Sequence, residues 1–334
     1  MSERKHGKVS ANGIEIHYVE EGTGPLVVMC HGFPESWYSW RHQLTALAGA
    51  GYRAVALDMR GYGGTSKPQN IAAYTVSHIV GDVVGAVRGL LSTQTEKQAV
   101  VVGHDWGGPI AWYAALMRPD LFRAVAVLSV PFSKPLALPP EVKLTDLMRA
   151  RAASGGDREY YRVYFQEPGV AEAELEADVH RTMLGLLYGA SGDVVKDGVA
   201  KDLGDGHFPK GKGFLNSLHL PKKLPAWLTE ADVAFYVKEL TASGFRGGLN
   251  WYRNIDAVPG ILSPFVGRTI EQPTLYLYGE LDLLAGNTPD AIKALPDALP
   301  NLKKLVKMEG AGHWLQQERA EETNAELIAF LKGL

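Results

Sequence analysis

A short stretch in the first third of the chain combines a reactive side chain with a backbone pattern that would expose it. An apolar run at residues 99–102 leads into Gly103-His-Asp105-Trp-Gly-Gly108, and a helix-like segment follows at 109–116. A strand, a glycine-flanked turn and a helix in this order place the central residue, Asp105, at the tip of a sharp turn. Glycine is needed at such a turn because the backbone is strained and crowds itself. The stretch therefore predicts a carboxylate presented for chemistry.

This arrangement resembles the nucleophile elbow of the α/β-hydrolase fold, in which serine usually occupies the central position. Aspartate in that place changes the expected reaction. Attack by a carboxylate on an ester or amide would leave an unstable mixed anhydride, whereas displacement at a saturated carbon gives an alkyl ester. Water can then hydrolyse that ester. Asp105 therefore predicts a two-step hydrolysis at a saturated carbon.

A nucleophile at the elbow needs a general base and a group that orients this base. In the α/β-hydrolase fold the order along the chain is nucleophile, acid and histidine. Asp282 follows a late apolar run, and His313 follows the next run within Gly-Ala-Gly-His-Trp. Glu280 is the competing acid, and Asp282 is preferred over it. Because both partners are present, an inactive scaffold in which Asp105 merely caps a helix is disfavoured.

Hydrolysis of the ester also needs donors for the negative charge that develops on its carbonyl oxygen. In this fold the donors are backbone N–H groups of the residue after the nucleophile and of an earlier loop. We therefore expect the oxyanion hole to be formed by Trp106 and Phe33, the latter in the loop after the apolar run at 26–30.

Epoxides and alkyl halides both undergo displacement at a saturated carbon, and their leaving groups need different partners. An opening epoxide develops an alkoxide, which a tyrosine can protonate as a general acid. A departing halide needs weak N–H donors such as tryptophan in apolar surroundings, and no proton. Tyrosines occur in two downstream segments, Glu-Tyr160-Tyr161-Arg-Val-Tyr164 and Asn-Trp-Tyr252-Arg-Asn. The residues alone do not show which tyrosine of the first segment would be the acid.

With these motifs the chain resembles the soluble epoxide hydrolases of the α/β-hydrolase fold, nearly from end to end. The resemblance rests on His31-Gly-Phe-Pro34, Gly103-His-Asp105-Trp-Gly-Gly108, Tyr161-x-x-Tyr164-Phe-Gln-Glu-Pro-Gly-Val-Ala-Glu-Ala-Glu-Leu, Asn-Trp-Tyr252-Arg-Asn and Gly-His313-Trp. It implies that Tyr161, rather than Tyr160 or Tyr164, and Tyr252 bind and protonate the epoxide oxygen. It also implies conversion of an epoxide to a vicinal diol, with no metal and no organic cofactor.

The resemblance assigns supporting roles to residues around the nucleophile. His31 and Pro34 belong to the oxyanion loop, where Pro34 shapes the turn that presents Phe33. Positions similar to Glu35 and His104 help to hold the hydrolytic water in the family, and a structural hydrogen-bonding role is the equal alternative here. A cis peptide before Pro34 is compatible with the sequence but cannot be read from it.

The composition disfavours several other classes of protein. A length of 334 residues suits two domains or one domain with a large insertion. The formal net charge of −3 provides no basic field for nucleic acid or an anionic membrane. Cys30 is the single cysteine, which excludes an intrachain disulfide, and its apolar run predicts a buried thiol. No segment reads as a signal peptide or reaches the ~18 apolar residues of a membrane span. We expect a cytoplasmic protein, and the sequence leaves open whether it forms a homodimer.

Alternation of apolar runs with helical periods predicts a mostly parallel sheet with helices on both faces. Strands are expected at 26–30, 52–57, 99–102, 124–128, 274–278 and 302–308, with helices at 38–50, 75–92 and 320–331. Two alternating runs around Asn12-Gly13 predict an N-terminal antiparallel hairpin within residues 8–20. A further helix should begin near Pro289, with Asn287 or Thr288 as its cap.

The alternation stops between residues 134 and 264, which predicts a helical cap inserted into the hydrolase core. Helical segments are expected at 170–189 and 229–243, the second behind a capping threonine. Residues 190–227, rich in Gly, Lys, Pro and Asp, should form a long excursion. The cap would lie over the carboxyl edge of the sheet, where ligands bind in open α/β sheets. The core would then consist of residues 1–133 and 265–334.

The predicted function is hydrolysis of a small-molecule epoxide by water. Asp105 attacks carbon, Tyr161 and Tyr252 protonate the oxygen, and His313 with Asp282 drives hydrolysis of the ester. A haloalkane dehalogenase that uses the same Asp–His–Asp set is the alternative enzyme. A ligand-binding receptor on a hydrolase scaffold is the alternative without catalysis, and the intact Asp–His–Asp set disfavours it.

Overall fold

The computed structural model describes residues 4–92, 94–139, 141–153, 155–199, 206–286 and 288–334. One eight-stranded sheet has the order β1-β2-β4-β3-β5-β6-β9-β10. The pairs β1–β2 and β2–β4 are antiparallel, and every pair from β4 to β10 is parallel. The bounds are β1 (Lys5–Ala11), β2 (Ile14–Glu21), β3 (Leu26–Cys30), β4 (Arg53–Leu57), β5 (Ala99–His104), β6 (Phe122–Leu128), β9 (Thr274–Gly279) and β10 (Leu302–Met308). The predicted fold class, a mostly parallel sheet with an N-terminal hairpin, is confirmed.

The N-terminal hairpin turns at the dipeptide that predicted it. Asn12 and Gly13 have φ values of 50° and 76°, and Ala11 pairs directly with Ile14. A two-residue loop with positive φ at both positions matches the twist of an antiparallel ribbon.

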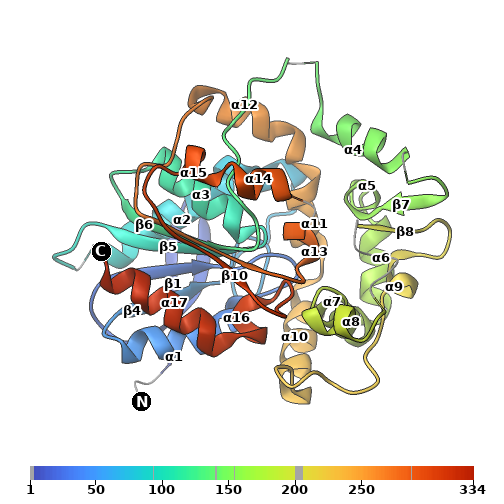
Figure 1. Ribbon diagram of the computed structural model, residues 1–334, viewed down its shortest axis with the longest axis horizontal. Helices are drawn as coiled ribbons and strands as arrows, with labels where there is room; N and C mark the ends of the chain where they lie inside the picture. Colours follow the sequence, from blue (N-terminus) through green and yellow to red (C-terminus); the bar gives the residue numbers. More distant parts are fainter. Residues whose placement is uncertain (1–3, 93, 140, 154, 200–205, 287) are drawn as a thin grey trace.

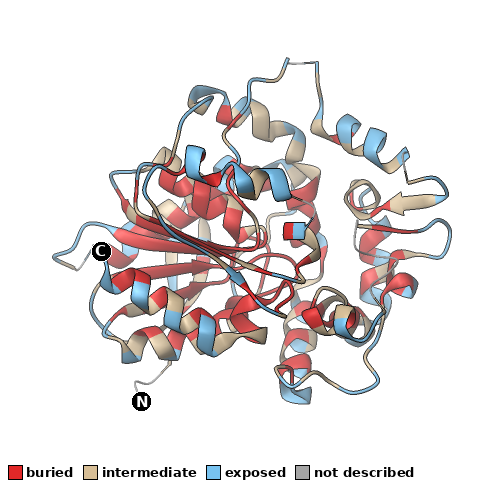
Figure 2. Cartoon of the chain, in the orientation of Figure 1, coloured by how far each residue is buried: buried red, intermediate tan, exposed pale blue. Residues whose placement is uncertain are grey.

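The sheet is covered on both faces, as its continuous apolar strands predicted (Figure 1). On one face, Val27 and Met29 of β3 pack with α1 (Arg41–Gly49) and α17 (Ala320–Lys332). On the other, Val28 and Cys30 pack with α2 (Val76–Leu91) and α3 (Gly107–Met117). Successive side chains of a strand point to opposite faces, so every residue of β3 is buried. Figure 2 shows the same burial along the central strands.

The chain between β6 and β9 is mainly helical, and α4 to α9 lie to the right of the sheet in Figure 1. Its helices are α4 (Leu144–Ala153), α5 (Tyr161–Tyr164), α6 (Val170–Ala177), α7 (Val179–Gly189), α8 (Gly192–Lys196), α9 (Phe214–Ser217), α10 (Glu230–Ser243), α11 (Arg246–Arg253) and α12 (Val258–Leu262). A small antiparallel pair, β7 (Arg158–Tyr160) and β8 (His207–Pro209), was not predicted. Three-residue strands are too short to show a periodicity. Within the predicted excursion, residues 200–205 lie outside the described ranges.

The helical segment predicted at 170–189 is confirmed except at Asp178, where it divides into α6 and α7. This residue has φ −148° and ψ 85°, and its carboxylate accepts a hydrogen bond from Arg181 N–H at 2.9 Å. It therefore acts as the N-cap of α7. The helix predicted at 229–243 is confirmed, with Thr229 and Asp232 forming the capping box of α10.

The remaining helices are short and connect the main elements. They are the 3₁₀ turns Trp37–Trp40, Ile71–Tyr74, Ile255–Ala257 and Ser263–Phe265, and α13 (Leu283–Gly286), α14 (Pro289–Lys293), α15 (Leu295–Ala298) and α16 (Leu315–Glu318). Helix α14 begins at Pro289, as predicted. Its N-cap residue is Thr288, whose side chain makes no capping hydrogen bond. The other predicted cap, Asn287, lies outside the described residues. No helix in the described ranges is long and apolar enough to cross a bilayer. The same residues contain no group of His, Cys, Asp or Glu side chains placed to hold a metal ion.

Candidate active site

Asp105 occupies a tight turn between β5 and α3. Its φ of 50° is positive, a conformation that is strained for a residue other than glycine. The neighbouring backbone is so close that a Cβ on Gly103 would meet the carbonyl oxygen of Gly107. A Cβ on Gly107 would likewise meet the carbonyl oxygen of Cys30. Both glycines are therefore needed for the turn that the sequence predicted.

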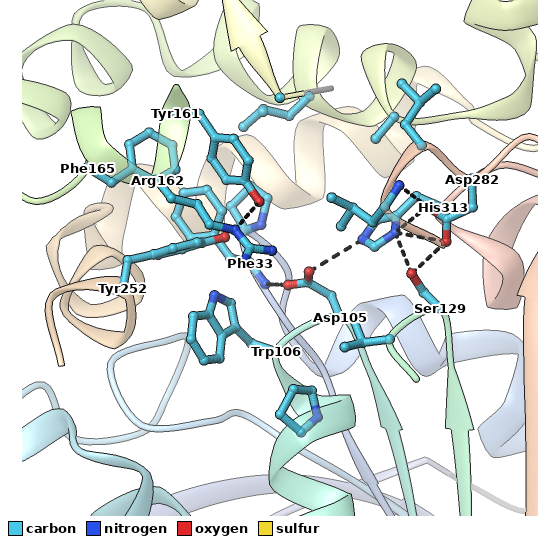
Figure 3. Close-up of a pocket in the computed structure, with 18 of the residues that line it drawn as sticks. Phe33, Asp105, Trp106, Ser129, Tyr161, Arg162, Phe165, Tyr252, Asp282 and His313 are labelled. Atoms are coloured by element: carbon cyan, nitrogen blue, oxygen red, sulfur yellow. Dashed lines mark hydrogen bonds and ion pairs between the residues drawn. The ribbon is translucent and has the colours of Figure 1, made fainter. Parts of the chain in front are cut away.

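The Asp105 carboxylate is held between a backbone donor and a histidine (Figure 3). Phe33 N–H donates to Oδ1 at 2.7 Å, and Nε2 of His313 lies 3.5 Å from Oδ2. Asp105 also lies at the N-terminal end of α3, where the helix dipole favours a negative charge. Burial alone would raise the pKa of this carboxyl, but the hydrogen bond and charge of His313 hold the pKa below its usual value. The carboxylate is therefore ionised.

The two predicted oxyanion donors differ in what they contact. Phe33 N–H already bonds Asp105, and the Phe33–Pro34 peptide is cis. Trp106, which follows Asp105, makes no hydrogen bond from its N–H to this carboxylate within the described part of the chain. The Trp106 side chain lines the cavity beside the carboxylate.

A carboxylate and a hydroxyl orient His313 through Nδ1, the ring nitrogen that does not face Asp105. Nδ1 of His313 lies 3.3 and 3.4 Å from the two carboxylate oxygens of Asp282. Ser129 Oγ is closer to Nδ1, at 2.9 Å, and donates to Asp282 Oδ2 at 2.5 Å. Leu284 N–H fixes the other carboxylate oxygen at 2.9 Å. These contacts leave Nε2 of His313 facing Asp105.

The structure distinguishes the two acids that the sequence offered. Glu280 points away from the cavity, where its carboxylate pairs with Lys307 at 3.2 Å and accepts from Gly310 N–H at 3.1 Å. Asp282 is buried and is the acid that reaches His313. The preference for Asp282 over Glu280 therefore agrees with the geometry.

The proton affinity of His313 is set by the two carboxylates on either side of it. Burial alone would lower the pKa of the imidazole, but the charge of Asp282 and the hydrogen bonds to both carboxylates raise this pKa to about 10. With Asp105 ionised, His313 is therefore an imidazolium at neutral pH. Removing either negative charge would lower the pKa of His313.

The predicted supporting residues are buried and bonded to the protein. His31 Nδ1 lies 2.8 Å from the Gly32 carbonyl oxygen. His104 Nε2 donates to the His313 carbonyl at 2.7 Å, and its Nδ1 lies 2.9 Å from Glu35 Oε2. Neither Glu35 nor His104 lines the cavity. In this geometry Glu35 orients His104, and His104 holds the backbone of the loop that carries His313.

A cavity of about 450 Å³ separates the carboxyl edge of the sheet from the helical segment. Asp105 and His313 line it from the sheet side, and Tyr161, Arg162 and Tyr252 line it from the other side. Figure 3 shows the two tyrosines across the pocket from the His313–Asp282 pair, with Asp105 between them. The tyrosine ring centroids lie 6.1 Å apart. The predicted nucleophile, the predicted histidine and its acid, and both predicted tyrosines are therefore brought to one cavity, whereas His31, Glu35 and His104 lie outside it.

Within the described part of the chain, no protein group accepts the hydroxyl proton of either tyrosine. Among the described residues, neither Tyr161 nor Tyr252 donates a hydrogen bond, and Tyr161 Oη accepts one from Arg162 Nε at 2.8 Å. Burial, the largest cause, raises the pKa of both phenols, so they are neutral donors at neutral pH. Tyr164 differs, because its hydroxyl donates to Glu174 at 2.5 Å and its side chain does not line the cavity. Tyr160 lines the cavity, with its ring 5.1 Å from that of His207.

Sequence reasoning missed two residues of this cavity, Ser129 and Arg162. Ser129 follows the last residue of β6 with φ 73°, so it stands at the carboxyl edge of the sheet like Asp105. Its place directly after a strand was the signal in the sequence that could have identified Ser129. Arg162 follows Tyr161 directly, and a charged residue within an aromatic segment was the signal for its role.

Comparisons with known proteins agree with the fold. Residues 25–183 match the family described as alpha/beta hydrolase fold. Epoxide hydrolase A of Mycobacterium tuberculosis is 41% identical over 98% of this chain and 97% of its own length. Epoxide hydrolase 2 of Siraitia grosvenorii is 39% identical over 99% of both chains.

Solved structures of epoxide hydrolases are also similar to this chain. An epoxide hydrolase from an endophytic Streptomyces superposes with a TM-score of 0.91 at 45% identity, covering 99% of this chain and 96% of that one. Epoxide hydrolase A from Mycobacterium thermoresistibile gives a TM-score of 0.87 at 41% identity over 99% of both chains. Identity at this level along the whole chain shows family membership as well as fold. This chain belongs to the epoxide hydrolase family of the α/β-hydrolase fold.

Proposed function

We propose that this protein adds water to an epoxide to give a vicinal diol through an alkyl ester on Asp105. One observation carries the proposal: an ionised carboxylate faces two neutral tyrosine hydroxyls whose protons no described protein group accepts. A nucleophile on one side and proton donors on the other match the two ends of an opening epoxide. The names of the relatives support the same substrate class.

The proposal assigns residues 134–264 as a cap and residues 1–133 and 265–334 as the core. The lining of the cavity supports this division, because Tyr161 and Tyr252 come from the intervening segment and Asp105 and His313 from the sheet edge. Each part contributes one half of the reaction. The cap supplies the acids, and the core supplies the nucleophile and the base.

In the first step, Asp105 Oδ2 attacks one carbon of the epoxide. The carbon–oxygen bond of the ring breaks, its electron pair stays on oxygen, and a proton passes to this oxygen from Tyr161 or Tyr252. The products are an alkyl ester on Asp105, a new hydroxyl group and a tyrosinate. General acids of this kind contribute about 10²- to 10⁴-fold to a rate.

Loss of the Asp105 charge prepares the second step. Because the ester is neutral, one of the two negative charges that keep His313 protonated is gone, and the imidazolium can return a proton to the tyrosinate through solvent. Neutral His313 then takes a proton from water as the water oxygen attacks the ester carbonyl carbon. The Phe33 N–H at Oδ1 and the Trp106 N–H stabilise the oxyanion. Its collapse expels the second diol oxygen, which takes the proton from His313. The proton left on the Asp105 carboxyl then passes to His313 and restores the starting ion pair.

The dehalogenase alternative has less support from the cavity. Trp106 lines it and could offer an indole N–H to a halide. The groups opposite Asp105 are nevertheless two phenols and a guanidinium, which suit an alkoxide better than a halide.

Diol formation from styrene oxide tests the proposal, with the native protein, Asp105→Ala and His313→Gln compared under the same conditions. We expect no diol from Asp105→Ala. His313→Gln should accumulate one epoxide mass on the protein, because ring opening proceeds and hydrolysis does not. Full diol formation by Asp105→Ala would disprove the mechanism, and halide release from an alkyl chloride that survives loss of both tyrosines would favour the dehalogenase.

A further inference from the structure

Arg162 is a cation inside the cavity that has no carboxylate partner among the residues the structure describes. Other arginines buried in this chain pair with a carboxylate: Arg60 with Asp82 at 2.6 Å and Arg253 with Glu172 at 2.6 Å. Arg162 lines the cavity, and within the described ranges its side chain reaches no carboxylate. A buried charge without a partner is costly, so such groups are often functional.

The side-chain partner of Arg162 is the phenol of Tyr161. Arg162 Nε donates to Tyr161 Oη at 2.8 Å, and Figure 3 draws this bond on the wall of the pocket that faces Asp105. A guanidinium can only donate hydrogen bonds. It therefore occupies a lone pair of the phenol oxygen and never accepts the phenol proton. The O–H of Tyr161 is left free to point at a ligand in the cavity.

The same contact matters after the proton has moved. When Tyr161 gives its proton to the epoxide oxygen, a negative charge forms on the oxygen that Arg162 already holds. A hydrogen bond from a cation to a neutral oxygen becomes a hydrogen bond between opposite charges, which is stronger. Burial raises the pKa of Tyr161, and the charge and hydrogen bond of Arg162 oppose this rise. Stabilisation that is greater after the transfer than before it accelerates the step.

We infer that Arg162 is a positioning residue for ring opening: it holds Tyr161 as a proton donor to the epoxide and stabilises the phenolate that this donation leaves. The inference rests on the proposed epoxide hydrolysis. In the step concerned, the carbon–oxygen bond of the epoxide breaks, the Asp105–carbon bond forms, and the Tyr161 proton goes to the released oxygen. Arg162 exchanges no atom.

Ring opening can be measured alone in the His313→Gln background, where the ester accumulates and intact mass reports its rate of formation. Arg162→Met removes the charge and the donor, and Arg162→Lys keeps the charge. Each is made with Tyr161 present and with Tyr161→Phe. Arg246→Met is the matched control, because Arg246 is an exposed arginine of α11 that does not line the cavity. Thermal melts of all variants show whether each one is folded.

With Tyr161 present, we expect Arg162→Met to slow ester formation by about 10- to 100-fold, the effect of losing one hydrogen bond to a charged group. Arg162→Lys should slow ester formation less than Arg162→Met does. Arg246→Met should form the ester at the same rate as His313→Gln alone. In the Tyr161→Phe background, Arg162→Met should have no further effect, because the residue acts through the phenol.

Three results would overturn the inference. One is an unchanged rate in Arg162→Met, and another is an equal loss in the presence and absence of Tyr161. The third is a rise in KM for phenylglycidate, a carboxylated epoxide, without slower ring opening of styrene oxide, because Arg162 would then bind a substrate carboxylate. If Arg162→Met does not fold, the comparison of Arg162→Lys in the two backgrounds makes the same test. Failure of the native protein to form diol is a separate result, which contradicts the proposed function itself.

Discussion

At the scale of single residues, the charge of His313 depends on the state of Asp105. Asp282 and Asp105 together raise the pKa of the imidazole to about 10, so the residue that the proposed mechanism uses as a base begins as an acid. Alkylation of Asp105 would remove one of these charges. The first step of the proposed reaction therefore creates the base for the second.

This coupling predicts that Asp105→Asn lowers the pKa of His313. The amide has the shape of the carboxylate and the neutrality of the ester, so only the attraction of Asp282 remains to oppose burial. An NMR titration of the His313 ring nitrogens measures the effect in native protein and in Asp105→Asn. The ring of the exposed His180 is the internal control, because it does not line the cavity that contains Asp105. An unchanged His313 pKa would contradict the coupling.

The two tyrosines that the proposed mechanism uses as acids give a second prediction. Tyr161→Phe and Tyr252→Phe should each lower kcat/KM for styrene oxide, and the double variant should lose about 10²-fold or more, because no phenol remains to protonate the alkoxide. Tyr164→Phe should retain near-native kcat/KM, since that hydroxyl is bonded to Glu174 outside the cavity. Steady-state kinetics of the four variants make the comparison. Native turnover by the double variant would show that the acid lies elsewhere.

The acid partner of the histidine gives a third prediction. Asp282→Asn should slow hydrolysis of the ester more than its formation, so that the ester accumulates during turnover. Glu280→Gln should turn over like the native protein, because Glu280 lies on the surface and pairs with Lys307. Intact mass during turnover distinguishes the two variants. Accumulation of the ester in Glu280→Gln alone would reverse the assignment.

Residue types and their place after strands were enough to place Asp105, Asp282 and His313 together, because the ends of parallel strands meet at one edge of the sheet. Their chemical roles stay predictions. The same reasoning could not predict that Ser129 and Arg162 contact the other residues of the site. Their importance lies in which atom faces which partner, such as Ser129 Oγ at 2.9 Å from the histidine. A sequence carries no such distance.

At the scale of elements, long periodic segments were predictable and short ones were not. The strands of the sheet and helices α2, α10 and α17 agree with the apolar patterns, because each buries a continuous face or stripe. The pair β7–β8 escaped prediction, because its strands have three residues each and are fixed by tertiary contacts. The break between α6 and α7 was missed because Asp178 is compatible both with a helix interior and with a cap.

Asp178 supplies a prediction at this scale. Asp178→Ala should lower the free energy of unfolding by about 1 kcal/mol, because the N-cap bond to Arg181 N–H is lost. Asp178→Asn keeps an acceptor and should lose little. Urea unfolding measures both variants, and diol formation should stay native because Asp178 does not line the cavity. Equal stability of the native protein and Asp178→Ala would show that the N-cap hydrogen bond of α7 contributes nothing to the free energy of unfolding.

At the scale of the whole molecule, protonation of His313 links folding to pH. The folded protein holds this proton up to about pH 10, whereas the unfolded chain releases it near the ordinary value of 6.5. The stabilisation is thus complete below pH 6.5 and is lost as pH rises toward 10. Within this window the free energy of unfolding should fall by at most about 1.4 kcal/mol per pH unit.

Urea unfolding at pH 7 and pH 8.5 measures this loss, with His313→Gln as the control. The native protein should lose stability between the two pH values, and the variant should lose clearly less, since it has no proton to release. Equal losses in the two proteins would show that His313 is not charged in the folded state.

The central claim is that water attacks an ester of Asp105 and never attacks the epoxide. A single turnover in H₂¹⁸O with enzyme in excess tests it most directly, followed by mass spectrometry of the diol and of the peptide that contains Asp105. We predict unlabelled diol and one ¹⁸O atom in the Asp105 carboxylate, because the water oxygen enters at the ester carbonyl. Labelled diol with an unlabelled Asp105 peptide would contradict the account.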